Sequence, residues 1–133
     1  MSETRILHTK TDGDVFIVLP QGEVGGFSGE QVSLEVDEVL AELKEAEAKQ
    51  VVVDFREVPY FGSCLLAAIQ RIWKHMNRFG GQLALCNVSE VGLDVLRVSR
   101  FVELWPIYDT REEAEGALHS NSARPQPDRL PNS

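Results

Sequence analysis

Ser63 and Cys64 stand at the point of this sequence where a side chain is best placed to do chemistry. They follow the β-branched run 51–53, which is typical of a strand buried on both faces. Pro59 has no backbone N–H and cannot continue a central strand, so the chain turns before it reaches the serine. A helical period follows the turn. The hydroxyl of Ser63 is therefore predicted at a helix start, at the C-terminal end of a core strand, where ligands bind in α/β folds.

A serine on a strand-to-helix turn could be the nucleophile of a hydrolase, but the local sequence argues against this. Leu65 stands where the nucleophile elbow G-x-S-x-G needs a small residue. His75 would lie on the same helix, roughly 18 Å from Ser63 at about 1.5 Å per residue, whereas a hydrogen bond spans ~3 Å. We therefore expect no catalytic residue and no enzymatic activity.

The other residues that often bind metals or cofactors show no useful spacing. His8, His119 and Cys86 match no metal-ligand pattern, and Cys86 lies in an apolar run that predicts an inert core thiol. The glycine-rich stretch 22–29 matches neither G-x-G-x-x-G nor the Walker sequence, so we expect it to permit a bent backbone. No metal and no cofactor are expected.

The composition of the 133 residues, with 43% hydrophobic and 26% charged side chains, predicts one soluble domain. A net charge of −8 disfavours nucleic acid and anionic membrane surfaces as partners. No apolar run approaches the ~20 residues of a transmembrane helix, so no direct membrane insertion is expected. Two cysteines without C-x-x-C spacing are typical of reduced thiols, and we expect a cytoplasmic location.

The elements that must position Ser63 follow from hydrophobic periodicity. Apolar runs around an Asp-Gly turn predict an antiparallel N-terminal hairpin. Later strands alternate with helices, which predicts an α/β fold: a mixed sheet with this hairpin, parallel later strands and four helices. The strands are predicted at 5–9, 15–19, 51–57, 83–86 and 101–107, and the helices at 28–49, 63–78, 89–98 and 110–118.

Each predicted helix also has a predicted inner face. The inner faces are formed by Val32, Val36, Val39, Leu40 and Leu43 in the first helix, by Leu65, Ile69, Ile72 and Met76 in the second, and by Val91, Val95 and Val98 in the third. The acidic residues Glu35, Asp37, Glu38, Glu42 and Glu45 are expected to form a solvated surface. The domain is predicted to span 1–118, and the Pro- and Ser-rich segment 119–133 to be a disordered tail.

Leu66 and Trp73 lie together on the second helix, roughly 80–100° away from its inner stripe. They could border the core, which is the commoner role of a large aromatic residue. They could instead help to form a protein-binding face.

From about Asp12 to Leu118 the sequence resembles a STAS domain, the module shared by sulfate transporters and bacterial anti-sigma factor antagonists. The family shows a G-E-L-D loop, a D-L-S-x-V-x-F-x-D-S-S-G-L segment, a G-G-x-L strand start and a P-I-Y-D ending. The matching segments are Gly22-Glu23-Val24-Gly25, Asp54 through Leu66, Gly80-Gly81-Gln82-Leu83 and Pro106-Ile107-Tyr108-Asp109.

The resemblance implies a function as an anti-sigma factor antagonist. In that family the first serine of D-S-S, which matches Ser63, is phosphorylated by an anti-sigma factor that is a serine kinase, and a phosphatase resets it. The unphosphorylated domain binds the kinase and frees a sigma factor, and the nucleotide belongs to the kinase. Ser63 could alternatively be only a helix cap. The expected partner-binding residues are Glu23, Val24, Gly25, Phe61, Gly62 and Cys64, together with Leu66 and Trp73.

Several residues depart from the family pattern at these partner-facing loops. Gly62 replaces the aspartate before the phosphorylated serine, Cys64 and Leu65 replace the serine and glycine after it, and Gly25 replaces the aspartate of the G-E-L-D loop. A second function therefore stays open. In it, the domain is a subunit without phosphorylation that docks on the ATPase of an ABC transporter or in a signalling complex.

Overall fold

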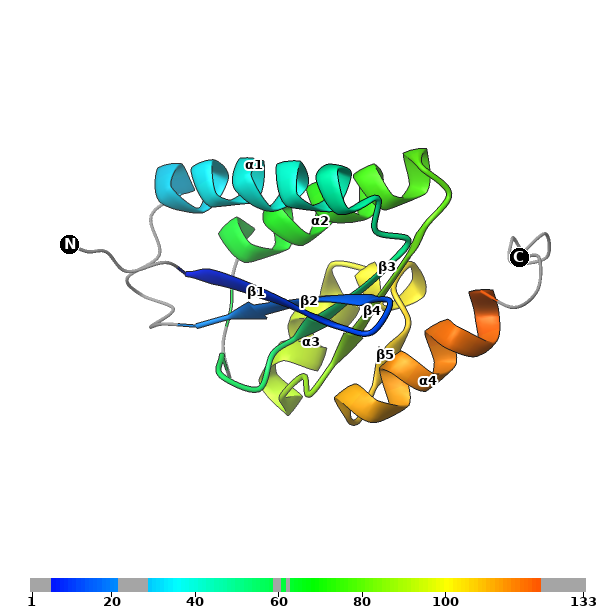
Figure 1. Ribbon diagram of the computed structural model, residues 1–133. Coiled ribbons are helices and arrows are strands. Elements are labelled where there is room, and N and C mark those ends of the chain that lie inside the picture. The colour runs from blue at the N-terminus through cyan, green and yellow to red at the C-terminus, as the bar shows by residue number, and fades with distance from the viewer. Residues whose placement is uncertain (1–5, 22–28, 59–60, 62, 123–133) are drawn as a thin grey trace.

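The computed structural model describes residues 6–21, 29–58, 61 and 63–122, except for the side chains of Ser63 and of residues 119–122. A five-stranded sheet in the order β1-β2-β3-β4-β5 forms its centre (Figure 1). β1 pairs antiparallel with β2, and the remaining neighbours pair parallel, which confirms the predicted mixed sheet. The strands are β1 (Leu7–Asp12), β2 (Val15–Pro20), β3 (Gln50–Asp54), β4 (Gln82–Cys86) and β5 (Ile107–Tyr108).

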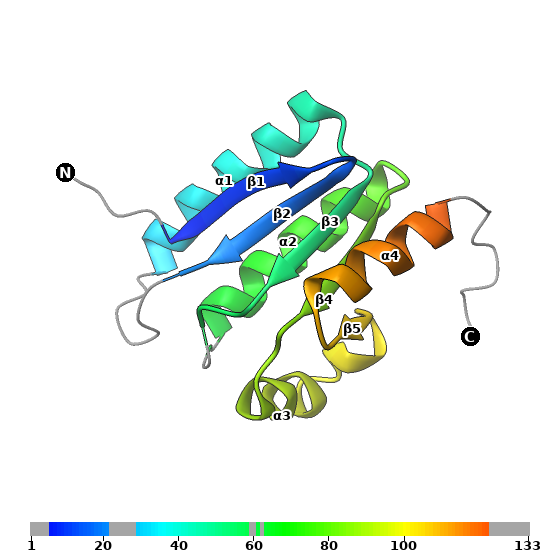
Figure 2. The same ribbon diagram turned by 60° about the horizontal axis from the view of Figure 1, so that its bottom comes forward.

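In the described part of the chain, four α-helices surround the sheet, as predicted. Two of them, α1 and α2, pack side by side on one face, and α4 covers the other face (Figures 1 and 2). Figure 2 shows α3 beside the β4–β5 edge of the sheet. The helices are α1 (Gly29–Ala46), α2 (Ser63–Arg78), α3 (Glu90–Val98) and α4 (Arg111–Ser122), with a short 3₁₀ helix, η2 (Phe101–Glu103), after α3.

Strand β3 is buried on both faces. Val51 and Val53 belong to the cluster under α1 and α2, whereas Val52 packs in the smaller cluster that includes Ala114 and Leu118 of α4. Since side chains alternate between the faces of a strand, a run of three valines fits only a strand that is covered on both sides. The structure thus confirms the prediction from residues 51–53.

The inner stripe of α2 is also confirmed, because Leu65, Ile69, Ile72 and Met76 are all buried. The predicted inner face of α3 is wrong. Val91 and Val98 are 48% and 86% exposed, while Leu96 and Gly92 face the core and Val95 is half-buried. The valine spacing was compatible with either of two faces of α3 pointing inward. Packing against the rest of the fold buries the face that contains Leu96.

The predicted strand 101–107 is wrong over most of its length. Residues Phe101–Glu103 form η2, and only Ile107 and Tyr108 pair with β4. The carbonyl of Phe101 accepts hydrogen bonds from the N–H groups of Leu104 (2.9 Å) and Trp105 (3.0 Å). The rings of Phe101 and Trp105 stack at 4.4 Å. These local contacts coil a segment whose apolar composition is typical of a strand.

Part of the acidic surface predicted on α1 is not solvated. Glu35 is only 7% exposed, and its carboxylate accepts hydrogen bonds from the backbone N–H groups of Ile6 (2.8 Å) and Leu7 (2.6 Å). Glu42 accepts a hydrogen bond from the hydroxyl of Thr9 at 2.8 Å. Among the described residues no strand pairs with the outer side of β1, so its outward N–H groups need other acceptors. Glu35 and Glu42 therefore fasten β1 to α1.

Two helix ends differ from the predicted ones. α1 ends at Ala46 rather than near Lys49, since Glu47 has a left-handed backbone with φ of 53°. α4 continues to Ser122, four residues beyond the helix end predicted at Leu118. Residues 119–122 of the segment predicted as a tail thus belong to α4, and residues 123–133 lie outside the described residues.

Candidate partner-binding site

The turn between β3 and α2 is anchored by buried side chains. Phe55, Val58 and Phe61 are at most 5% exposed, and the rings of Phe55 and Phe61 lie 4.7 Å apart. The N–H of Val58 donates to the carbonyl of Phe55 (3.0 Å), and the N–H of Phe55 donates to the carbonyl of Cys86 on β4 (3.0 Å). We call the described residues of this segment, 55–58, 61 and 63, the Ser63 turn. Its described residues are held to the core at both ends.

Asp54, the last residue of β3, directly precedes this turn. Its side chain is fully buried, and Oδ1 accepts hydrogen bonds from the N–H of Arg56 and from the side-chain amide of Asn87, both at 3.0 Å. The guanidinium groups of Arg56 and Arg111 lie 3.9 and 3.8 Å from Oδ2. Sequence reasoning assigned Asp54 no role, although a charged residue at the end of an apolar buried strand was a usable signal.

Cys86 lies beside Asp54 in β4 and is fully buried. Burial, followed by the negative charge of Asp54, raises the pKa of the Cys86 thiol to about 12. A thiol with such a pKa is protonated at neutral pH and is a poor nucleophile. This agrees with the prediction of an inert core thiol.

Helix α2 begins at Ser63, as the sequence predicts. The first N–H groups of a helix have no partner within it, and the helix dipole adds partial positive charge at this end. No acidic side chain lies in the first turn of α2. The position therefore suits a negatively charged group such as a phosphate.

Cys64 connects this helix start with α1. Its side chain is half-buried, and a Cβ added to Gly29 would lie 3.6 Å from its sulfur. Gly29 is the first residue of α1, so the beginnings of α1 and α2 lie next to each other. A groove of about 380 Å³ runs between the helices from this point. Its lining residues are Gly29, Val32, Ser33, Val36, Cys64, Ala67, Ala68 and Arg71.

Leu66 and Trp73 lie apart on α2. Both are half-buried against the main core, and Leu66 lies in the first turn of α2 beside the Ser63 turn. Trp73 lies roughly 15 Å from Ser63 along the helix, at about 1.5 Å per residue. Its ring meets Trp105 edge-on at 6.3 Å. The structure therefore places Trp73 at the border of the core, away from the other predicted site residues.

A comparison with protein families gives a direct match to this fold. The model of the STAS domain matches residues 7–114, which is most of the chain. The chain belongs to the STAS domain family. The predicted motifs therefore lie in a true member of this family.

The STAS domain also resembles individual proteins over most of its length. It is 29% identical over 109 residues to the protein BtrV of Bordetella bronchiseptica, which is named as an anti-sigma factor antagonist, with 82% of this chain and 90% of that protein covered. An anti-sigma F factor antagonist of Paenibacillus polymyxa is 26% identical over 100 residues, with coverage of 75% and 83%. The solved structure of the Thermotoga maritima protein TM1081 matches with a TM-score of 0.76 and 25% identity, over 91% of this chain and all of that one.

The remaining predicted site residues are either buried or outside the described residues. Phe61 is 5% exposed and belongs to the core, so only a small part of its ring could touch a partner. Glu23, Val24, Gly25 and Gly62 lie outside the described residues. The residues that the structure brings together are thus Phe61, Cys64 and Leu66 around the start of α2.

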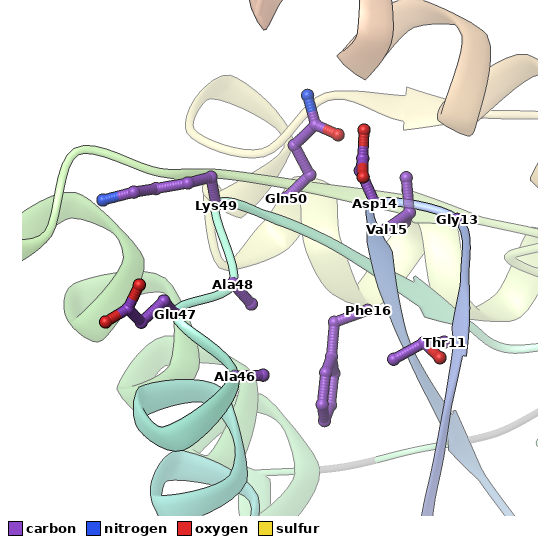
Figure 3. Close-up of a pocket in the computed structure, with 10 residues that line it drawn as sticks. All are labelled: Thr11, Gly13, Asp14, Val15, Phe16, Ala46, Glu47, Ala48, Lys49 and Gln50. Atoms are coloured by element: carbon purple, nitrogen blue, oxygen red, sulfur yellow. The ribbon is translucent and has the colours of Figure 1, made fainter.

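A second hollow of about 440 Å³ lies at the opposite end of the sheet (Figure 3). It is lined by the β1–β2 turn and by residues 46–50, which lead into β3. Figure 3 shows Phe16, Thr11 and Ala46 facing the hollow, while the side chains of Lys49 and Glu47 point away from it. Polar groups do not converge here, so we do not assign it as the site of the STAS domain.

His75 also lies far from Ser63, near the C-terminal end of α2. Partial burial, and then the positive charges of Arg78 and Lys44, lower the pKa of His75. Within the described part of the chain, no three side chains of His, Cys, Asp or Glu are grouped so as to hold a metal ion. None of the described helices of the STAS domain is both long and apolar enough to cross a membrane.

Proposed function

We propose that this chain is an anti-sigma factor antagonist that binds an anti-sigma factor through the Ser63 turn and the start of α2. The anti-sigma factor is a serine kinase, and it ends the interaction by phosphorylating Ser63. The observation that carries the proposal is the position of Ser63 as the first residue of α2, at the carboxyl end of the central strand. The names of the two relatives from Bordetella and Paenibacillus support the same function.

The binding surface in this proposal is small and apolar at its centre. Leu66 and Cys64 each leave part of their surface exposed beside Ser63, and the groove between α1 and α2 extends the surface. A partially exposed apolar cluster with polar surroundings is typical of the centre of a protein interface. Arg71 lines the groove and is paired with Asp37 at 2.6 Å, so it supplies a charged rim.

The switch follows from the charge that phosphorylation adds. The kinase transfers the terminal phosphoryl group of its ATP to the Ser63 oxygen, which loses its proton, and a phosphatase later hydrolyses the ester with water. A phosphoserine carries about −1.5 to −2 charge at pH 7. The N-terminal end of α2 stabilises this charge within the domain. An acidic partner surface at the same place would be repelled, and an apolar one would desolvate the phosphate at a cost. The fold therefore tolerates phosphorylation while the interface does not.

This proposal places catalysis and nucleotide binding in the partner, so it assigns this chain no catalytic residue and no cofactor. It also requires that the chain work in the cytoplasm, where sigma factors act. The alternative is a permanent subunit that docks on an ABC transporter ATPase or in a signalling complex without phosphorylation. Cys64 and Leu65 motivate that alternative, because they differ from the serine and glycine of the family pattern.

The test is affinity purification of the full chain from its native cells, with bound proteins and the phosphate on Ser63 identified by mass spectrometry. We expect a serine kinase among the partners and a phosphorylated fraction at Ser63. Ser63→Glu should lose the kinase, and Ser63→Ala should retain it permanently. Ser99→Ala is the matched control, since Ser99 is an exposed serine at the end of α3. Recovery of a transporter ATPase with unmodified Ser63 would replace the proposal by the alternative.

A further inference from the structure

Asp54 connects three segments that are far apart in the sequence. Through Oδ1 it holds the N–H of Arg56, at the root of the Ser63 turn, and the side chain of Asn87, between β4 and α3. Through Oδ2 it faces Arg111, the first residue of α4. A fully buried carboxylate strongly requires such partners, because an unpaired charge in the core is costly. The position of the turn is thus tied to this one side chain.

The contact with α4 is incomplete. Asp54 Oδ2 and Arg111 Nη1 are both buried, and neither has a hydrogen-bond partner among the described residues. They lie 3.8 Å apart, which is within ion-pair distance but beyond a good hydrogen bond. Arg111 also approaches Glu115 on its own helix at 3.7 Å. A modest shift of the start of α4 would therefore strengthen or break its link with Asp54.

We propose that Asp54 is the positioning residue of the Ser63 turn, and that Arg111 makes the rigidity of this turn depend on the placement of α4. The functional part of this inference rests on the proposed function at Ser63. When the start of α4 moves away, Asp54 loses Arg111 and keeps only Arg56 near Oδ2, so its buried charge is less well compensated. The Ser63 turn then becomes less rigid. A molecule that binds at α4 can thereby change the Ser63 turn from a second place on the domain.

The structural test is amide hydrogen exchange by NMR on the full chain. Asp54→Ala removes the acceptor of the Arg56 N–H, so its exchange should become at least about tenfold faster relative to amides of β4. Arg111→Met should accelerate the same amide by about threefold. Glu112→Gln is the matched control, because it changes the charge of α4 at an exposed side chain, and it should leave the Arg56 amide unchanged. Equal acceleration of Arg56 and β4 amides in Asp54→Ala would overturn the positioning role.

A conservative variant separates hydrogen bonding from charge and remains useful if Asp54→Ala does not fold. Asp54→Asn keeps an oxygen for the Arg56 N–H, so it should restore most of the protection. On this neutral background Arg111→Met should have no further effect, because the ion pair is already gone. If Arg111→Met still loosens the turn there, Arg111 acts by another route and the coupling to α4 is rejected.

The functional arm measures the rate at which the partner kinase phosphorylates Ser63 in Asp54→Asn and in Arg111→Met. Both rates should differ from the wild-type rate by more than that of Glu112→Gln. If the wild-type chain is not phosphorylated, the proposed function fails, whereas the exchange measurements still decide whether Asp54 positions the turn. If exchange changes as expected but both variants are phosphorylated at the wild-type rate, the regulatory part of the inference is rejected.

Discussion

Helices α2 and α3 both follow a parallel strand and a serine lies at the start of each, yet the two starts are held differently. Ser89 precedes α3, and its hydroxyl oxygen accepts a hydrogen bond from the N–H of Gly92 at 3.0 Å. The start of α2 is preceded by a turn that Phe55, Phe61 and Asp54 hold to the core. One helix start therefore depends on its serine as a cap. The other follows a turn that buried side chains anchor to the core. Under the proposed function, these anchors let Ser63 be modified without loss of the fold.

The largest expected effect tests the anchors of the Ser63 turn. Phe61→Ala removes a ring that is 5% exposed and packs on Phe55, so it should lower the free energy of unfolding by about 3–5 kcal/mol. Urea denaturation of the full chain measures this loss. Phe79→Ala is the control, because Phe79 is 47% exposed and should cost much less. Equal losses would mean that the turn is not anchored through Phe61.

Gly92 provides a smaller test of the place where α3 meets the Ser63 turn. A Cβ at Gly92 would lie 2.8 Å from both Phe61 Cε2 and Val88 Cγ1, so Gly92→Ala should destabilise the domain by about 1–3 kcal/mol through overpacking. Thermal unfolding checks this effect. Gly116→Ala has nothing within 4 Å and lies in α4, so it should stabilise by about 0.5–1 kcal/mol. A stabilising Gly92→Ala would contradict the close contact.

Ser89, the capping serine of α3, tests the difference between the two helix starts directly. Ser89→Ala deprives the Gly92 N–H of its acceptor and should cost about 1 kcal/mol. Thr110→Ala is a matched cap variant, since its hydroxyl oxygen accepts a hydrogen bond from the N–H of Glu113 at 3.1 Å, and a similar loss is expected. Both are measured by urea denaturation. A negligible effect of Ser89→Ala would show that α3 does not rely on its serine.

The smallest effect concerns the outer face of α3. Val98 is 86% exposed, so Val98→Lys should change the free energy of unfolding by less than about 0.5 kcal/mol. Leu96→Ala on the opposite face should cost about 2–5 kcal/mol, because Leu96 is fully buried. A large loss in Val98→Lys would restore the face of α3 that was predicted from the valine spacing.

The sequence predicted the structure correctly where a hydrophobic pattern was compatible with one arrangement only. Three consecutive valines in β3 and the regular stripe of α2 each allow a single arrangement, and the helix start at Ser63 follows from them together with Pro59. The face of α3 was not predictable, because Val91, Val95 and Val98 compete with Leu96 for the same core.

The missed features depend on contacts between distant residues. Phe101 begins η2, where its ring stacks on Trp105. The ring of Trp73 packs edge-on against the same tryptophan at the border of the core. Asp54 matters through Arg56, Asn87 and Arg111, whose convergence on one carboxylate exists only in the folded chain. Composition and periodicity carry no information about such contacts between distant residues.

The fastening of β1 by Glu35 has a consequence for how other proteins can approach this domain. An exposed sheet edge invites any extended chain to pair with its backbone, with little regard for side chains. Here the N–H groups of Ile6 and Leu7 are already occupied by Glu35, so that end of the edge resists addition of a foreign strand. A partner that approaches this end of β1 must therefore contact side chains rather than pair with the backbone. Such a surface can change its partner through single substitutions, without remodelling the sheet.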